Sequence, residues 1–417
     1  MAMSLGFHII FAVIGIAMPL LMVIAEVLWR RTGDEEYLDL AKNWAKGTTV
    51  LFAVGAVSGT VLSFELGLLF PTFMRHAGPV IGMPFSLEGF AFFTEAIFLG
   101  LYLYGWARLS GPMHLFAGAM VAISGLASAV FVLIANAWMN APVGFRVVDG
   151  EFVDIDPFRA MLTPFALHTI THMVAAAYMA TGFAVAGIHA WAFLTGRGSG
   201  FHRKAMTIAL AVAIPFTLAQ PLIGDFAGKM VAKHQPLKLA AMERLEKTEE
   251  GAALRIGPIE IPGLLSFISY GDFNATVRGL EEWPREDWPH PMVSWSFKLM
   301  VALGMWMAAV SAFALLLLAR KKPWSSNRWL LRALVISAPM GFIALEVGWV
   351  VTEVGRQPWV IYEIMRTVDS VTPMPGLVVP FTLFTLIYIG LSITTIAILR
   401  TQIRGTLVPA VDDGEVA

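Results

Sequence analysis

The chain has 417 residues, of which 57% are hydrophobic and only 14% are Asp, Glu, Lys or Arg. Soluble domains carry about 25% charged residues, so this composition excludes an ordinary water-facing surface. The formal net charge of −1 excludes a nucleic-acid-binding protein held to phosphates by a basic field. The absence of cysteine excludes disulfides, iron–sulfur clusters, thiolate zinc sites and covalent c-type haem attachment. The sequence therefore predicts an integral membrane protein.

Nine apolar stretches are long enough to cross a hydrocarbon core of about 30 Å, which takes about 20 helical residues. In chain order they are 5–29, 47–70, 86–107, 113–138, 163–194, 205–224, 292–319, 329–353 and 376–399. Helices satisfy their own backbone polar groups in lipid, so the expected fold class is an all-α bundle of about nine transmembrane helices. The first stretch is too long, and has no preceding basic region, for a cleaved signal peptide.

Lys and Arg in the connections predict the orientation. With the N-terminus outside, the cytoplasmic connections and the C-terminal tail carry 14 basic residues, and the short outer connections carry five. The expected organisation is helices one to six over 1–224, an outer loop over 225–291, helices seven to nine over 292–399, and a cytoplasmic tail over 400–417. Within the loop, the polar run Lys238 to Glu250 predicts an amphipathic or solvated helix, and the acidic run 412–415 predicts a disordered tail.

Ionisable side chains within spans cost several kcal/mol unless they are neutral, paired or bound, and here they form a pattern. Glu88 and Glu95 are seven residues apart on the third span, and Glu346 and Glu353 are seven apart on the eighth. Each pair shares one helix face, and Trp349 lies on the face of the second pair. A single such Glu could be a protonated structural residue, but two matched pairs indicate function.

Histidine and methionine supply candidate haem or metal ligands. The span boundaries place His8, His168, His172 and His189 within the membrane, with His189 near a cytoplasmic end. His168 and His172 are one turn apart on one face. A lone helix histidine is more often a hydrogen-bonded structural residue, and Met300 alone would indicate packing.

Depth in the membrane separates two functions that polar spans can serve. His8, Glu88, His172, Met300 and Glu353 all fall in the outer half of the predicted bundle. This distribution favours one cofactor cluster near the outer face over a transport path through the whole thickness. The sequence has no P-loop, no HExxH motif and no His-His pair for a copper–haem site.

Over nearly its whole length, the chain resembles subunit I of the cytochrome bd-type quinol oxidases. The most specific match is Gly355-Arg356-Gln357-Pro358-Trp359, preceded by Glu346, Trp349 and Glu353 at the family spacing. The other matching motifs are Gly6-Phe7-His8, the run 88–95 from Glu88 to Glu95, Ala135-Asn136-Ala137-Trp138-Met139, His172 with Tyr178, the run 238–243 from Lys238 to Glu243, and Phe297-Lys298-Leu299-Met300.

The resemblance implies a role for each matching residue. His172 and Met300 would be the axial ligands of a low-spin haem b. His8 and Glu353 would ligate two high-spin haems, a haem b and a haem d, in an order that the resemblance leaves open. Glu88, Glu95 and Ser128 would lie beside the high-spin pair or on the proton route. Arg356 and Lys298 would pair with haem propionates, and Trp349 would lie between haems. Lys238 and Glu243 would act at the quinol site.

Three departures from the family pattern indicate a divergent branch. Fewer residues than usual precede His8, and Lys298 stands where Arg is common, which removes bidentate pairing. On the second span, the run 63–68 shifts the carboxylate of Glu65 by two residues from its usual place. A cyanide-insensitive type, in which a further haem b replaces haem d, would fit these differences.

The resemblance implies a respiratory quinol:oxygen oxidoreductase in a prokaryotic plasma membrane. It would oxidise membrane quinol at the outer face, reduce O2 to water with protons from the cytoplasm, and work beside subunit II in a membrane heterodimer. It would conserve energy without a pump. The alternative from another class is a proton-coupled secondary transporter that uses the Glu pairs as a relay; a subunit that has lost its haems is a second alternative.

Overall fold

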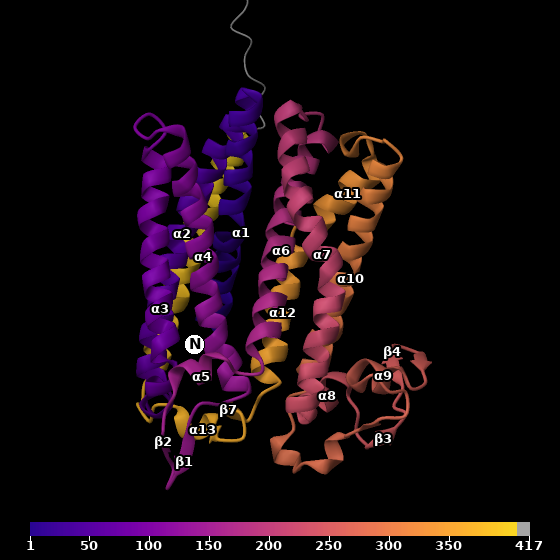
Figure 1. Cartoon of the computed structure of the whole chain (residues 1–417). Helices are drawn as coiled ribbons and strands as arrows, with labels where there is room; N and C mark the ends of the chain where they lie inside the picture. The colour runs from indigo at the N-terminus through magenta and orange to yellow at the C-terminus, as the bar shows by residue number, and fades with distance from the viewer. Residues whose placement is uncertain (407–417) are drawn as a thin grey trace, which may run out of the picture.

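The computed structural model describes residues 1–406, which form a bundle of long helices (Figure 1). Within this range, nine helical segments are long and apolar enough to cross a membrane, so the expected all-α fold is confirmed. They are α1 (Ala2–Thr32), α2 (Glu35–Leu69), α3 (Pro71–Tyr104), α4 (Gly111–Asn140), α6 (Ala166–Leu194), α7 (Gly200–His234), α10 (Met292–Ala319), the pair α11 (Arg328–Ser337) and α12 (Met340–Val354), and α14 (Val378–Thr406). The predicted disordered run 412–415 lies outside the described residues.

Short helices and strands gather at the end of the bundle that the basic connections assign to the outside (Figure 1). Three antiparallel hairpins and one pairing of distant strands, β3 with β6, lie here. The short helices are α5 (Pro157–Met161), α8 (Pro236–Glu243), α9 (Leu264–Tyr270) and α13 (Thr367–Ser370), with 3-10 turns at 280–282 and 285–287. The strands are β1 (Arg146–Val148), β2 (Glu151–Val153), β3 (Glu249–Glu250), β4 (Leu254–Ile256), β5 (Ile259–Ile261), β6 (Thr276–Val277), β7 (Trp359–Ile361) and β8 (Met365–Arg366).

The expected amphipathic or solvated helix over Lys238–Glu250 is shorter than predicted, and the expectation of a solvated environment is wrong. Helix α8 ends at Glu243, because Arg244 adopts a left-handed backbone conformation, and the chain continues into strand β3. Apolar side chains of α8 pack against Val293 of α10 and Val351 of α12. Helix α8 is therefore buried between the rest of the outer loop and the bundle, and Lys238 is only 4% exposed.

The eighth predicted span is two helices with a break between Ser337 and Met340. Pro339 lies at the break, where its missing N–H prevents a continuous hydrogen-bond ladder. The break packs closely against α6: a Cβ added at Gly187 would come within 2.7 Å of the Ala338 side chain. Small residues thus let the broken span approach α6.

Helix α6 is the most enclosed of the nine spans and α14 is the least enclosed. Alanine and glycine dominate the buried face of α6, which allows neighbouring backbones to approach. Contacts are densest between α6 and α7, α3 and α4, and α1 and α2. These three helix pairs form the frame on which the polar residues are placed.

The span histidines are more numerous than the sequence boundaries indicated. His76 lies in α3, His114 in α4, and His202 and His234 in α7. His189, which was expected to reach water, is buried, and its Nδ1 lies 2.8 Å from Nδ1 of His202. His76, His202 and His234 were not expected because α3 and α7 extend well beyond their apolar stretches, whereas His114 lies inside the predicted stretch 113–138 and was overlooked there.

Substitution of Gly341 by alanine is expected to destabilise the bundle. The added Cβ would meet the Cα of Ala180 at 2.5 Å, so α12 and α6 would have to separate, at a cost of about 1–3 kcal/mol. The thermal unfolding midpoint in mild detergent should therefore fall. Gly390→Ala on α14 is the matched control, because its Cβ would meet nothing within 4 Å. Equal midpoints for the two variants would contradict the proposed close contact.

Candidate functional site

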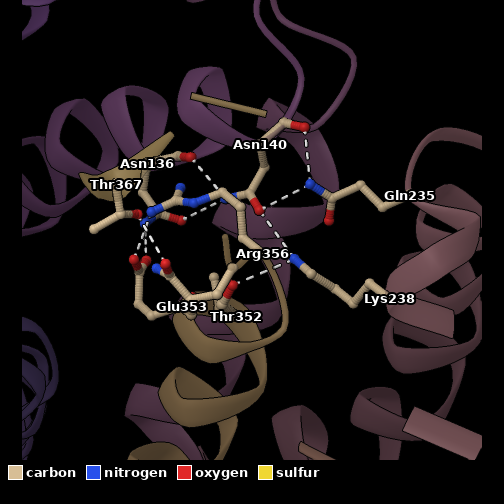
Figure 2. Close-up of polar contacts among 9 residues, drawn as sticks. Asn136, Asn140, Gln235, Lys238, Thr352, Glu353, Arg356 and Thr367 are labelled. Atoms are coloured by element: carbon tan, nitrogen blue, oxygen red, sulfur yellow. Dashed lines mark hydrogen bonds and ion pairs between the residues drawn. The ribbon is translucent and has the colours of Figure 1, made fainter. Parts of the chain in front are cut away.

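An ion pair between the buried Arg356 and the half-buried Glu353 lies at the outer end of α12 (Figure 2). The Arg356 guanidinium donates from Nη2 to Oε2 of Glu353 at 2.6 Å. The other carboxylate oxygen of Glu353 accepts a 2.6 Å hydrogen bond from Nδ2 of Asn136, on α4. Gly355 ends α12 directly before the arginine, which turns the chain toward Pro358 and the β7–β8 hairpin. Both oxygens of this membrane carboxylate are therefore satisfied from two elements.

Arg356 has more donors than the described part of the chain supplies acceptors. Only 2% of its surface is exposed, yet its Nε and Nη1 have no hydrogen-bond partner among residues 1–406. A permanently charged guanidinium with buried, unpaired N–H groups is costly unless an acceptor binds it. This arrangement fits a carboxylate-bearing group that binds beside α12, such as the propionates of a haem.

Asn140 connects this ion pair to the outer loop (Figure 2). Its Oδ1 accepts hydrogen bonds from Nζ of Lys238 at 3.0 Å and from Nε2 of Gln235 at 3.2 Å. Its Nδ2 donates to the backbone carbonyl of Asn136 at 2.9 Å. Lys238 also donates to the backbone carbonyl of Thr352 at 3.3 Å. A continuous polar network therefore runs from helix α8 through α4 to the end of α12.

Burial is the main influence on Lys238. It lowers the pKa of this amine to about 7, and the positive charge of Arg356 lowers the pKa further while Glu353 opposes the decrease. Near neutral pH the side chain can therefore exist in both the ammonium and the amine form. A buried amine of this kind can bind and release a proton during a reaction.

Glu243 lies at the other end of α8 and has a different partner. Burial raises the pKa of its carboxyl group, and the charge of Lys298 on α10 partly offsets this increase. No ion pair joins Glu243 to Lys238 within residues 1–406. The two side chains thus belong to different surroundings, in line with the 140° separation that the helix predicts.

The two residues that the resemblance assigns to the low-spin haem, His172 and Met300, come from α6 and α10. The Cε1 atom of His172 lies 4.0 Å from a Cβ position at Gly224 on α7, and Sδ of Met300 lies 3.0 Å from one at Gly348 on α12. Nδ1 of His172 is buried and has no hydrogen-bond partner in the described part of the chain. Gln220 donates to the backbone carbonyl of His172 at 3.2 Å and so fixes this turn of α6. Trp349 packs beside Gly348 against the main core.

His8 lies on α1, the first span, and Glu346 of α12, in the eighth span, packs against the same helix. His8 contacts Oγ of Ser58 on α2 through Nδ1 at 3.0 Å, and its ring packs on Gly59. A Cβ at Gly6 would lie 3.2 Å from Oε2 of Glu346, whose other oxygen is buried and has no hydrogen-bond partner among the residues that the structure describes. Glu65, displaced from the family position, is buried and accepts a hydrogen bond from Ser4 at 2.7 Å.

The Glu88 and Glu95 pair lies between α3 and α4. Oγ of Ser128 donates to Glu88 at 3.2 Å. Glu95 is buried against Gly125, where an added Cβ would lie 3.0 Å from its Oε1. The three residues that the resemblance assigns to one region are therefore adjacent in the structure.

Sequence reasoning missed the residues that link these parts. Asn136 appeared only within a motif, and Asn140 and Gln235 were not singled out. Each is a neutral amide at a helix end, and neutral amides give little signal in a search for ionisable groups. The available signal was position: Asn136 and Asn140 are one helical turn apart on α4, so they share a face.

Comparison with known proteins identifies the family. The family model described as cytochrome bd terminal oxidase subunit I matches residues 1–407. The chain is 35% identical to the putative cytochrome bd menaquinol oxidase subunit I of Bacillus subtilis, covering 96% of this chain and 94% of that one. It is 31% identical to cytochrome bd ubiquinol oxidase subunit 1 of the same organism, covering 88% and 83%. The chain belongs to the cytochrome bd terminal oxidase subunit I family.

A solved structure supports the same assignment. The bd oxidase from Geobacillus thermodenitrificans is similar to this chain with a TM-score of 0.89 and 37% sequence identity, over 97% of this chain and 96% of that one. The protein is thus an oxidoreductase and a multi-pass protein of a bacterial cell membrane. Membership of this haem-binding family favours the oxidase over the proton-coupled transporter. The unpaired nitrogens of His172 and Arg356 fit a bound haem.

Removal of the buried amine should change how stability depends on pH. The lowered pKa of Lys238 means that the unfolded chain binds more protons than the folded one between about pH 7 and pH 10. The free energy of unfolding should therefore rise by about 2 kcal/mol from pH 7 to pH 9, relative to Lys238→Met. Denaturation in mixed micelles measures this difference. The exposed Lys229→Met variant is the control, and parallel pH profiles for wild type and Lys238→Met would contradict the prediction.

Proposed function

We propose that this chain oxidises membrane quinol at its outer loop and reduces O2 to water at bound haems, with protons drawn from the cytoplasm. The names of the relatives, which include menaquinol and ubiquinol oxidases, support quinol as the substrate. The observation that carries the proposal is the network from Lys238 through Asn140 and Asn136 to Glu353. It joins the loop expected to bind quinol to the carboxylate expected to bind haem.

On the quinol side, Lys238 and Glu243 provide groups that can bind a head group and accept its protons. The raised pKa of Glu243 makes its carboxylate a stronger base than an exposed glutamate. Lys238, with a pKa of about 7, can donate a hydrogen bond to a quinol oxygen or accept a proton. Quinol loses protons together with electrons, so bases at this site would release the protons outside.

On the haem side, His172 and Met300 would hold a low-spin haem b, and His8 and Glu353 would hold two high-spin haems. These would be a haem b and either a haem d or a further haem b. When bound, the haems supply electron transfer and the iron at which oxygen is reduced. Arg356 and Lys298 would neutralise propionates, and Trp349 would pack between haems. A histidine–methionine ligand set leaves no open position, which suits electron transfer.

On the proton side, Ser128, Glu88 and Glu95 would deliver protons to the site of oxygen reduction. Their hydrogen bond and shared α3–α4 interface support one route. Protons taken from inside and released outside by quinol would separate charge, which is worth about 2.3 kcal/mol per charge at 100 mV. The enzyme would therefore be electrogenic without a separate pump.

The proposed assembly is a membrane heterodimer with subunit II. Relatives named as subunit I support this composition. Many large apolar side chains on α2, α3 and α14 face outward, for example Phe64, Phe90 and Phe381. Lipid and a second membrane subunit would together cover such a surface.

Ligand substitution tests the low-spin haem assignment. His172→Ala should abolish the low-spin signal in reduced-minus-oxidised spectra, because alanine offers no donor atom. Met300→Leu should leave an unstable or five-coordinate site with a lowered potential. His168→Ala is the matched control on the same face of α6, and its spectrum should be unchanged. A normal low-spin spectrum in His172→Ala would transfer the assignment to His168.

Loop variants test the quinol site. Lys238→Ala and Glu243→Ala should each impair quinol oxidation by on the order of 10-fold or more, since each removes a buried proton-binding group. Haem spectra should remain intact, because neither residue is expected to ligate iron. Steady-state oxygen consumption with a soluble quinol measures the effect, and Lys247→Ala, in the turn after α8, is the control. Wild-type kinetics in both variants would remove the quinol site from α8.

A further inference from the structure

A second buried polar cluster lies near the opposite end of the bundle, on α1, α3 and α4. Glu26 of α1 is 0% exposed, and its Oε1 accepts hydrogen bonds from Nε and Nη2 of Arg30 at 2.8 and 2.6 Å. The same oxygen lies 2.9 Å from Nδ1 of His114 on α4. Nε2 of His114 lies 2.9 Å from the backbone carbonyl of Tyr102, near the C-terminus of α3. None of the roles assigned above uses this cluster.

The contacts of His114 determine how many protons the cluster holds. A backbone carbonyl only accepts hydrogen bonds, so Nε2 must carry a proton. A short contact between Nδ1 and a carboxylate oxygen also needs a proton between the two atoms. Either the histidine is an imidazolium or Glu26 is a neutral acid. The Glu26–His114 pair therefore holds one proton more than a neutral imidazole and an ionised carboxylate would hold together.

Two further polar atoms in the cluster remain available. Oε2 of Glu26 and the hydroxyl of Tyr102 are both buried and form no close hydrogen bond within the described residues, although the two side chains lie near enough to interact with each other. The rings of Tyr102 and Trp106 both pack on the His114 ring, with centroids 4.5 and 4.0 Å away, and they lie 5.4 Å from each other. Buried polar groups without partners are costly, so they indicate a place where a proton or water binds.

One member of the cluster reaches the surface at the end of the bundle that the basic connections assign to the cytoplasm. The Arg30 side chain is 29% exposed and lies in the last turn of α1. Gly111, at the start of α4, leaves room for its guanidinium, since a Cβ there would lie 2.5 Å from Nη1. The cluster thus connects solvent with a fully buried carboxylate.

The cluster aligns with the acidic residues deeper in the membrane. On α3, Tyr102, Glu95 and Glu88 are seven residues apart, so they lie on one helix face. On α4, the opposing positions are His114, Gly118, Gly125 and Ser128. A Cβ at Gly118 would meet the Tyr102 ring at 2.7 Å, and one at Gly125 would meet Glu95 at 3.0 Å. The two glycines let both side chains lie against α4.

We propose that Glu26 and His114 form the cytoplasmic entrance of the proton route to Glu95, a proposal that rests on the oxidase function proposed above. A proton from cytoplasmic water is taken up by the Glu26–His114 pair and leaves it toward Tyr102. The seven residues from Tyr102 to Glu95 span about 10 Å, so water carries the proton across this interval. Each proton that leaves the pair is replaced from the cytoplasm, so the pair returns to its starting state.

The test measures proton uptake by the complete oxidase in liposomes. The fully reduced enzyme is mixed with oxygen, a pH-sensitive dye reports proton uptake, and absorption reports haem oxidation. Glu26→Gln and His114→Gln keep the side-chain size but cannot hold the extra proton. Uptake should slow by on the order of 10-fold in each, with unchanged haem spectra. Glu26→Asp should restore uptake in part, because it retains a carboxylate.

A matched control separates transfer from folding. Asp34→Asn removes a partner of Lys204 in an ion pair at the same end of the bundle, away from the α3–α4 face, and should leave uptake unchanged. One outcome is that Glu95→Gln slows proton uptake, whereas Glu26→Gln and His114→Gln fold, keep their haem spectra and do not slow it. In that case the proposed entrance at Glu26 and His114 is wrong, and the proton route through Glu95 stands. If Glu95→Gln also leaves uptake unchanged, the proposed route is wrong and the entrance fails with it.

Discussion

Arg356 carries a permanent charge at a position where 2% of its surface is exposed, and the outer site is organised around satisfying that charge. Glu353 supplies the counter-charge, and Asn136 supports Glu353 from another helix. Loss of Glu353 would be destabilising, because it would leave the buried charge of Arg356 without compensation. The ends of α12 and α4 are therefore held in one arrangement. Helix α8 is held to the same arrangement through Lys238 and Asn140.

Helix α4 connects the two polar regions of the molecule. Its outer end contributes Asn136 and Asn140, and its inner end contributes His114. Between them, Gly125 and Ser128 face Glu95 and Glu88. Most of the remaining surface of α4 is apolar, so its polar positions are few and specific. One helix thus joins the chemistry expected at the outer face to the proton supply expected from the inner face.

The nine spans could be predicted from sequence because apolar length is a direct consequence of bilayer thickness. The matched pairs Glu88–Glu95 and Glu346–Glu353 could also be predicted, since helix geometry fixes which residues share a face. The environment of Lys238 could not be predicted, because a short polar run in the sequence fits a solvated helix and a buried helix equally well. The role of His114 was also beyond prediction: its partner Glu26 is 88 residues away, and only the packing of α1 on α4 brings them together.

If His172 binds a haem as proposed, the packing of helix α6 has a consequence for electron transfer. The helix carries His172 near one end, and alanine and glycine along its length let neighbouring backbones pack directly on it. Tightly packed interiors have low compressibility, so a ligand on such a helix moves little when the charge of its partner changes. Small nuclear displacement on oxidation and reduction means a low reorganisation energy. The small side chains of α6 would therefore favour fast electron exchange, independently of any polar residue in the site.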